Sequence, residues 1–184
     1  MRLSQPRIEP LEADQWSEEA SKVLAPILAA GPPLNIFTTL AHHPGLMRRW
    51  MVFANHVLGK STLPARQREI AILRIGYLCR SAYEWGQHVE IGRASGLSDE
   101  DIRRIQIGPD TPAWSELDRA VLAATDELHA DSFISDPTWA ALAEHLTTEQ
   151  IMDVVFAVGQ YNLVSMALNS FGVQPEAGLP GWDV

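Results

Sequence analysis

Between residues 79 and 88 the chain reads CRSAYEWGQH, which places a thiol, a carboxylate and an imidazole within ten positions. Glu84 and His88 are four residues apart, so on a helix of about 3.6 residues per turn they share one face. A carboxylate in that position orients the imidazole and raises its pKa, which leaves the ring able to accept or deliver a proton. The first turns of a helix also supply backbone N–H donors that suit an anion. The stretch therefore predicts a proton-handling site.

The same residues also admit a purely structural interpretation. Ser81 and Glu84 fit the capping box S-x-x-E, in which the serine caps a helix and the glutamate bonds back to the backbone. In that case Tyr83 and Trp85 are core aromatics, and His88 is a packing residue. Glu84 thus either only begins a helix or faces His88, and both alternatives stay open.

Glu69 is a second candidate carboxylate. In a regular helix it shares a stripe with Ile72 and Leu73, and a carboxylate on an apolar stripe is costly unless it is paired or protonated. Arg74 and His88 are the candidate partners. Buried acids of this kind occur in active sites and in structural ion pairs alike, so both meanings remain open.

Thiol and metal chemistry are poorly supported by the sequence. Cys79 is the single cysteine, which excludes an intramolecular disulfide, and it ends an apolar segment where a buried thiol is usually inert. Glu84 and His88 supply only two metal ligands at helical spacing, and no H-E-x-x-H motif is present. We predict neither a metal nor a cofactor.

These residues lie in a chain whose start and stop signals are helical throughout, without a convincing period-two strand. The sequence predicts one all-α domain, because the linker GPDTP at 108–112 is too short to separate two. Eight helices are expected, at about residues 17–31, 43–59, 65–79, 81–96, 97–108, 114–131, 135–146 and 147–172.

Several segments are more apolar than a surface helix requires. The helix at 70–79 is apolar nearly all round, which places it in the middle of a bundle or at a subunit interface. Together with the apolar stretches at 151–158 and 163–168 it favours a homo-oligomer, and a monomer with a central helix is the alternative. A polar stripe of Asn162, Ser165 and Asn169 either lines a pocket with Tyr161 or bonds helices together.

Composition excludes several classes of partner. Of 184 residues, 46% are hydrophobic and 20% charged, an ordinary globular balance, and the net charge of −9 argues against a nucleic-acid or anionic-membrane surface. The first residues lack the apolar run of a signal peptide, and no stretch approaches the roughly 18 apolar residues of a membrane span. We expect a cytoplasmic protein.

The motifs R-E-x-x-x-L-R (68–74), Y-E-W-x-x-H (83–88) and G-L-S (96–98) together resemble the carboxymuconolactone decarboxylase family, which also contains the AhpD-like alkylhydroperoxidases. The resemblance extends over about residues 34–173 of the single domain 1–184. It implies an AhpD-like helical bundle of about seven or eight helices, assembled as a trimer or hexamer, with a dimer as the alternative.

The two branches of that family differ in chemistry. Counting back from His88, the two cysteines of the peroxidase-type C-x-x-C would fall on Ser81 and Glu84, and neither can act as a thiol. The decarboxylase-type pattern is matched instead. The resemblance thus implies a carboxy-lyase-like enzyme that uses Glu69, Glu84 and His88 in acid–base chemistry on a small carboxylate- or lactone-bearing metabolite. Its substrate-binding candidates are Arg74, Tyr83, Ser81, Tyr161 and Asn162.

Two other functions compete with this expectation. Alkylhydroperoxidase-like antioxidant activity is disfavoured by the missing C-x-x-C and requires an exposed Cys79 of low pKa. A non-catalytic helical oligomer that binds a small ligand requires Glu84 to be only a helix cap. The sequence identifies no substrate.

Overall fold

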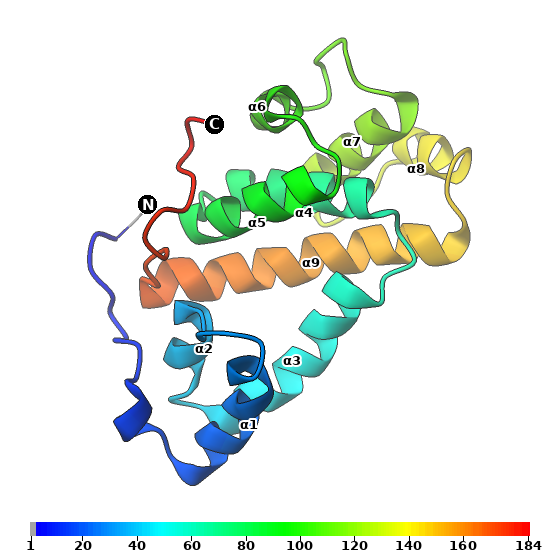
Figure 1. The fold of residues 1–184 in the computed structure, drawn as a ribbon. Helices are drawn as coiled ribbons and strands as arrows, with labels where there is room; N and C mark the ends of the chain where they lie inside the picture. The colour runs from blue at the N-terminus through cyan, green and yellow to red at the C-terminus, as the bar shows by residue number, and fades with distance from the viewer. Residues whose placement is uncertain (1–2) are drawn as a thin grey trace.

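The computed structural model describes residues 3–184, and all regular structure in that range is helical (Figure 1). This confirms the predicted fold class. A short 3-10 turn at Ala13–Gln15 precedes nine α-helices: α1 (Glu18–Leu28), α2 (Asn35–Leu40), α3 (Pro44–Gly59), α4 (Ala65–Leu78), α5 (Ala82–Ala94), α6 (Asp99–Ile107), α7 (Glu116–Asp131), α8 (Asp136–Ala143) and α9 (Thr148–Phe171).

Helix α2 is the element that the sequence did not predict. It has only six residues, too few for a hydrophobic period to be recognised. Its first N–H group, on Asn35, donates to a carboxylate oxygen of Glu176 at 2.7 Å. A partner 141 residues away in the sequence therefore caps this helix, and local sequence signals cannot show such a contact.

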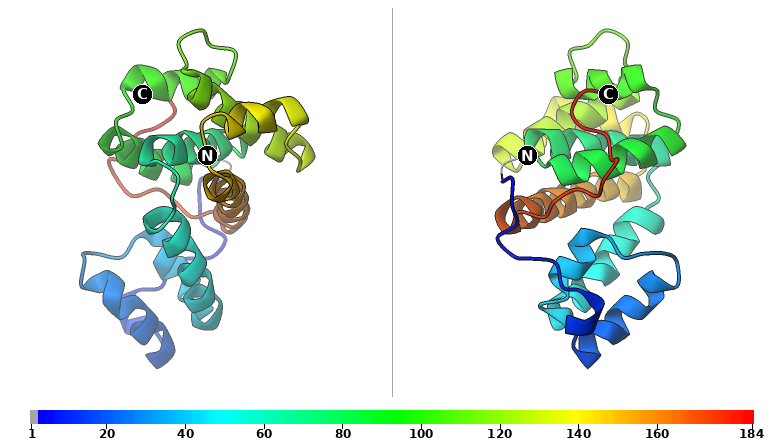
Figure 2. Two further views of the ribbon diagram at one scale, coloured as in Figure 1. Left: turned by 90° about the vertical axis from the view of Figure 1, so that its right-hand side faces the viewer. Right: turned by 60° about the vertical axis from the view of Figure 1, so that its left-hand side comes forward.

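The long helix α9 divides the molecule into two parts. In Figures 1 and 2 helices α4–α8 lie on one side of α9, and α1–α3 lie on the other. Contrary to the expectation from the sequence, α9 is long and apolar enough, by length and composition alone, to cross a membrane. Half of its apolar window is buried inside the protein, as a helix between two layers requires.

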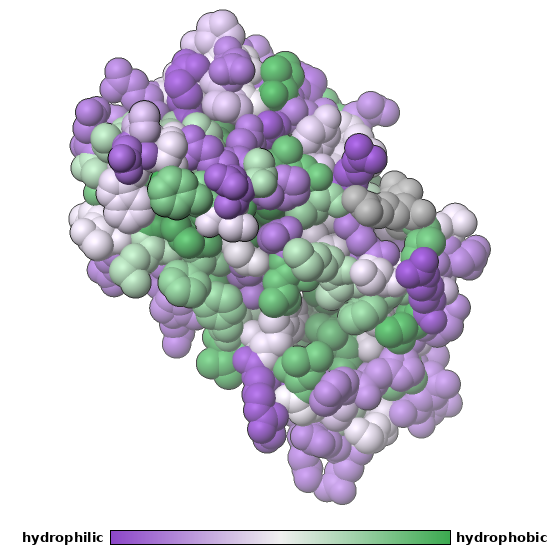
Figure 3. Space-filling view, turned by 180° about the vertical axis from the view of Figure 1, so that it is seen from behind, coloured by the Kyte–Doolittle hydropathy of each residue, from purple (hydrophilic) through white to green (hydrophobic). Residues whose placement is uncertain are grey.

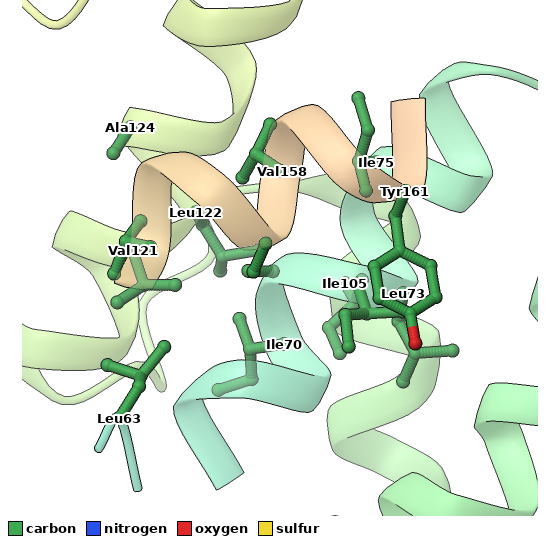
Figure 4. Close-up of a cluster of buried hydrophobic side chains, with 14 of the residues drawn as sticks. Leu63, Ile70, Leu73, Ile75, Ile105, Val121, Leu122, Ala124, Val158 and Tyr161 are labelled. Carbon is green, nitrogen blue, oxygen red and sulfur yellow. The ribbon is translucent and has the colours of Figure 1, made fainter. Parts of the chain in front are cut away.

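Helix α4 forms the centre of the larger part. Five consecutive or nearly consecutive side chains of α4 have no exposed surface: Ile70, Ala71, Ile72, Leu73 and Ile75. They pack against residues of α7 and α9 (Figure 4). The apolar character of α4 is therefore explained by burial within one chain, and it does not by itself require a second subunit.

A tight corner between α4 and α5 sets the register of the two helices. Arg80 has a positive φ of 54°, and Ser81 follows as the N-cap of α5, with its N–H donating to the carbonyl of Gly76 at 2.9 Å. A Cβ atom on Gly76 would lie 3.4 Å from Cβ of Glu84. The glycine thus lets the first turn of α5 lie close against α4.

The segment after α9, residues 172–184, returns across α5 towards α6 (Figure 1). The indole N–H of Trp85 donates to the carbonyl of Gly181 at 2.8 Å, and the Trp85 ring lies 5.4 Å from that of Trp182. A Cβ atom on Gly86 would lie 3.1 Å from the carbonyl oxygen of Pro180. This tail therefore covers the outer face of α5.

Candidate active site

Glu69, Glu84 and His88 form one buried cluster, which we call the acid–imidazole cluster. Glu69 lies on α4, and its Oε2 is 2.7 Å from Nδ1 of His88 on α5. The other ring nitrogen, Nε2, is 3.5 Å from Oε2 of Glu84, one helical turn away. The imidazole therefore lies between two carboxylates and contacts one through each nitrogen.

The structure decides between the two interpretations of Glu84. Ser81 is the N-cap of α5, as predicted, but its side chain makes no capping hydrogen bond and no capping box forms. Glu84 instead has 5% of its surface exposed and contacts His88. The capping-box interpretation was wrong, because the Glu84 carboxylate turns towards α4 and the imidazole rather than back to the backbone.

Glu69 has two partners, although the predicted candidate Arg74 is not one of them. Its Oε1 accepts a hydrogen bond from Nε of the adjacent Arg68 at 3.1 Å, and its Oε2 pairs with His88. The side chain is fully buried. Arg68 and His88 together provide hydrogen bonds to both oxygens of the buried Glu69 carboxylate. The carboxylate is thereby held in place and orients the His88 imidazole.

The environment raises the pKa of both Glu84 and His88. Burial raises the pKa of Glu84 to about 7, with the charge of His88 lowering it and that of Glu69 raising it. Burial lowers the pKa of His88, but the hydrogen bond to Glu69 and the charges of Glu69 and Glu84 outweigh this and raise it overall. An acid whose pKa is near neutral suits proton transfer at physiological pH.

Glu84 and His88 open onto a cavity of about 150 Å³ between α2, α3, α5 and α9. Its walls are mainly apolar, and their aromatic members are Phe37, Trp50, Tyr83 and Tyr161. The ring of Tyr161 packs edge-to-face on His88, with 4.8 Å between the ring centroids. Tyr161 also belongs to the large core cluster (Figure 4), so it fixes the imidazole against the core.

Tyr83 lines this cavity, as predicted, but its hydroxyl group is already occupied. It donates to Glu176 at 3.0 Å and accepts from the N–H of Ile36 at 3.3 Å. Glu176 also accepts from Nε2 of Gln87 at 2.6 Å. The Glu176 carboxylate thus joins the wall residues of α2 and α5, and no local sequence signal pointed to it.

Gln160 is a cavity residue that the sequence did not reveal. It lies on α9, has 4% of its surface exposed and lines the cavity beside Tyr161. No hydrogen bond from its side chain to another described residue is present. The only available signal was a polar residue within an apolar helix, and the same signal applied equally to the neighbouring Asn162.

Arg74 lies outside the cavity. Its guanidinium makes a two-point ion pair with Asp126 of α7, with distances of 2.6 and 2.8 Å. Its NH1 also donates to the carbonyls of Ile105 and Gln106 at 2.8 and 2.9 Å. These contacts commit Arg74 to joining α4, α6 and α7, which argues against the predicted carboxylate-binding role.

Ser81 and Asn162 are also outside the cavity. Asn162 accepts a hydrogen bond from the thiol of Cys79 at 3.1 Å, and Asn169 donates to the Cys79 carbonyl at 2.9 Å. Asn162 and Asn169 of the polar stripe therefore bond α9 to the end of α4, which was the second of the two roles predicted for the stripe, whereas the Ser165 hydroxyl has no partner among the described residues. The Ser81 hydroxyl is buried, and no described residue provides it with a hydrogen-bond partner.

Cys79 lies at the C-terminal cap of α4 and packs against the main core. It is not among the residues that line the cavity with His88. Within residues 3–184 no group of three or more His, Cys, Asp or Glu side chains is arranged to hold a metal ion. The titratable side chains of the described residues that line this cavity are Glu84, His88, Tyr83 and Tyr161.

Solved structures of other proteins share this fold. A peroxidase-related protein with an alkylhydroperoxidase AhpD core, from Ralstonia eutropha JMP134, has a TM-score of 0.82 with 20% identity, covering 97% of each chain. A protein of unknown function from Agrobacterium tumefaciens has a TM-score of 0.70 with 24% identity over 75% of this chain and 95% of that one. The fold is thus AhpD-like, as predicted.

The debrominase Bmp8, solved in complex with 2,3,4-tribromopyrrole, has a TM-score of 0.77 with 12% identity, covering 95% of this chain and 94% of that one. The model of the carboxymuconolactone decarboxylase family matches residues 44–127 of the present chain. This match, which includes the whole acid–imidazole cluster, confirms the predicted family resemblance. No curated protein sequence matches the chain.

Proposed function

We propose that this protein is an enzyme that transfers protons to and from a small lactone- or carboxylate-bearing metabolite, in the manner of a carboxymuconolactone decarboxylase-like enzyme. The observation that carries the proposal is the position of His88, held by Glu69 at 2.7 Å on one side and facing Glu84 at 3.5 Å on the other, at the cavity wall. A purely structural ion pair would not need a second carboxylate on the cavity side.

Each member of the cluster has a definable part in this chemistry. Glu69 orients the imidazole and stabilises its protonated form, since it is fully buried and bonded to Nδ1. The pair of Glu84 and Nε2 of His88 then takes a proton from the substrate and returns one, because both groups face the cavity. A pKa of about 7 leaves Glu84 able to exist in either form near neutral pH.

The cavity walls bear on the kind of substrate. No lysine or arginine is among the described residues that line the cavity, and Arg68 and Arg74 both pair with carboxylates. The groups available to a polar substrate atom include Glu84, His88, Tyr161 and Gln160, with Asn55 and the indole N–H of Trp50 also in the wall. These suit the carbonyl of a lactone better than a carboxylate, whose charge only a protonated His88 could balance.

A panel of small lactones, with and without a carboxylate, would test the proposal. Carbon dioxide release reports decarboxylation, and uptake of deuterium from solvent reports proton transfer without it. We expect His88→Gln to reduce either activity by about a hundredfold or more, the usual contribution of an acid–base group. His56→Gln is the matched control, because His56 is exposed and lies outside this cavity. Equal turnover by the His88→Gln variant would remove the proposed mechanism.

The competing functions fit the geometry less well. Reduction of a hydroperoxide needs a thiolate at the reacting position, whereas Ser81 and Glu84 stand in the two cysteine positions and Cys79 bonds to Asn162 outside the cavity. The non-catalytic alternative gives Glu84 only the role of a helix cap, and that cap does not form.

We also propose that the protein self-associates. Large apolar side chains of α3 and α9 are exposed side by side, with the rings of Phe53 and Phe156 6.0 Å apart and 38% and 53% exposed. Met152 is also exposed, at 54%, and lines one hollow together with both rings. We call these three residues the apolar surface patch. A second copy of the chain would remove it from water.

A further inference from the structure

We propose that a second cavity, formed by α2, α3 and α9 and called here the apolar groove, binds a small amphipathic carboxylate, with its hydrocarbon chain in the groove and its head group at Arg49. The groove has a volume of about 370 Å³ and adjoins the cavity that contains His88, with which it shares the lining residues Ile36, Trp50 and Val164. This inference does not depend on the proposed acid–base activity.

The depth and chemistry of the groove suit an apolar chain. Its walls include Ile36, Val164, Leu168 and Val173, which are buried in the rest of the protein, and apart from Thr39 and Arg49 every lining residue is apolar or aromatic. The volume falls in the range of about 300–1,000 Å³ found for small-molecule sites. Figure 3 shows that apolar side chains also gather in a band across one face of the molecule.

Two buried hydrogen-bond donors among the lining residues, together with Arg49, indicate the chemistry of the head group. The hydroxyl of Thr39 and the indole N–H of Trp50 are buried, and no described residue serves as a partner for either; Thr39 lines only the groove, whereas Trp50 also lines the His88 cavity. Buried polar groups are normally satisfied, so donors of this kind indicate that water or a ligand supplies the acceptor. Thr39 is only 3% exposed and lies in the groove wall.

Arg49 supplies the charge. Its NH1 donates to the carbonyl of Gly45 at 2.9 Å, within its own helix, and no described carboxylate lies within ion-pairing distance of it. The adjacent Arg48 differs, because it approaches Glu19 at 4.0 Å and does not line the groove. An arginine at an apolar groove, with its charge not neutralised, is complementary to a molecule that has a hydrocarbon body and a single carboxylate.

The apolar surface patch does not compete for this site. The patch involves Phe53, Met152 and Phe156, in the later part of α3 and the first half of α9, and none of them lines the groove. The groove instead involves the second half of α9, from Leu163 to Phe171. A second copy of the chain can therefore cover the patch while the groove receives a small ligand.

Isothermal titration of the full-length protein with hexanoate, octanoate and decanoate tests the proposal, with decanol as the uncharged probe. We expect affinity to rise by up to about fourfold per methylene group. Decanoate should bind at least about fivefold more tightly than decanol, because a charge-assisted hydrogen bond adds to the binding. Affinity that does not change with chain length, or decanol binding as tightly as decanoate, would overturn the assignment.

Matched variants locate the site. Arg49→Gln should weaken decanoate binding at least about fivefold and leave decanol binding unchanged, whereas the control Arg48→Gln should alter neither. Ala167→Phe, which fills the groove, should abolish binding of both, with circular dichroism confirming that the variant is folded. Equal losses in the two arginine variants, or no loss in Ala167→Phe, would contradict the proposal. A decrease in affinity as protein concentration rises would show that a second copy occupies the groove.

Discussion

Replacing Glu84 with glutamine should make the protein more stable than the wild type, by an amount that grows as the pH rises. Burial raises the pKa of Glu84 from 4.5 to about 7 in the folded protein. A carboxyl group whose pKa is raised on folding binds its proton more tightly when folded, so its contribution to stability is present below about pH 4.5 and is lost as the pH rises through about 7. Glutamine has a similar shape and stays neutral, so it avoids this loss.

The size of the effect follows from the same pKa. Each pKa unit corresponds to about 1.4 kcal/mol, so a rise from 4.5 to about 7 is worth about 3 kcal/mol when fully developed. About 2.5 kcal/mol of this accumulates between about pH 5 and about pH 8. Removing Glu84 also removes a charge that raises the pKa of His88, which makes the stability of the variant still less dependent on pH.

Urea unfolding at about pH 5, 6.5 and 8 measures the difference, with the free energy of unfolding extrapolated to water. Glu90→Gln is the control, because Glu90 lies on the same helix but is exposed and pairs with Arg93 at the surface. We expect the difference between wild type and the Glu84→Gln variant to change by about 2 to 3 kcal/mol over this range and that of the control to stay constant. A constant difference for Glu84→Gln would refute the assignment of a buried, ionisable carboxylate.

Three further outcomes are expected. Arg74→Lys should lower the free energy of unfolding measured by chemical denaturation by about 2 kcal/mol, because lysine cannot make the two-point pair with Asp126. Ligand binding at the His88 cavity should stay unchanged in this variant. Weakened binding there would restore the predicted substrate-binding role of Arg74. Cys79 should react with a thiol reagent at least about tenfold more slowly in the folded than in the unfolded protein, because it packs against the core, and equal rates would revive thiol chemistry. Phe156→Glu should shift the mass measured by light scattering from an oligomer to a smaller species, since it places a charge in the apolar surface patch; a wild type that is already monomeric would contradict self-association.

Local sequence patterns predicted the helices and the acid–imidazole cluster because both depend on short spacings. The four-residue spacing of Glu84 and His88 sets their contact at 3.5 Å, and the apolar stripe around Glu69 implied that this acid is buried and paired. Helix boundaries followed from start and stop signals in the sequence, and the side chains of Ser98 and Thr147 do accept hydrogen bonds from the first turns of α6 and α9.

Features that depend on distant segments could not be predicted. Arg74 and Asp126 are 52 residues apart, so the local pattern offered Glu69 as a partner for Arg74 and could not show Asp126. The predicted capping box at Ser81 does not form for a related reason. In the folded protein the Glu84 carboxylate contacts the His88 imidazole instead of the backbone N–H of Ser81. The position of Gln160 in the cavity wall likewise depends on how α9 is rotated against its neighbours.

The contacts of Glu176 have a consequence for how the protein matures during its synthesis. This carboxylate caps α2 through Asn35 and holds Tyr83 and Gln87, across sequence separations of 141, 93 and 89 residues. When residue 88 has been synthesised, the acid–imidazole cluster is complete in sequence. Glu176, which holds Tyr83 and Gln87 of the cavity wall, has not yet been added at that point. Every helix of the described chain is therefore complete in sequence before the residue that fixes the wall beside His88 has been added.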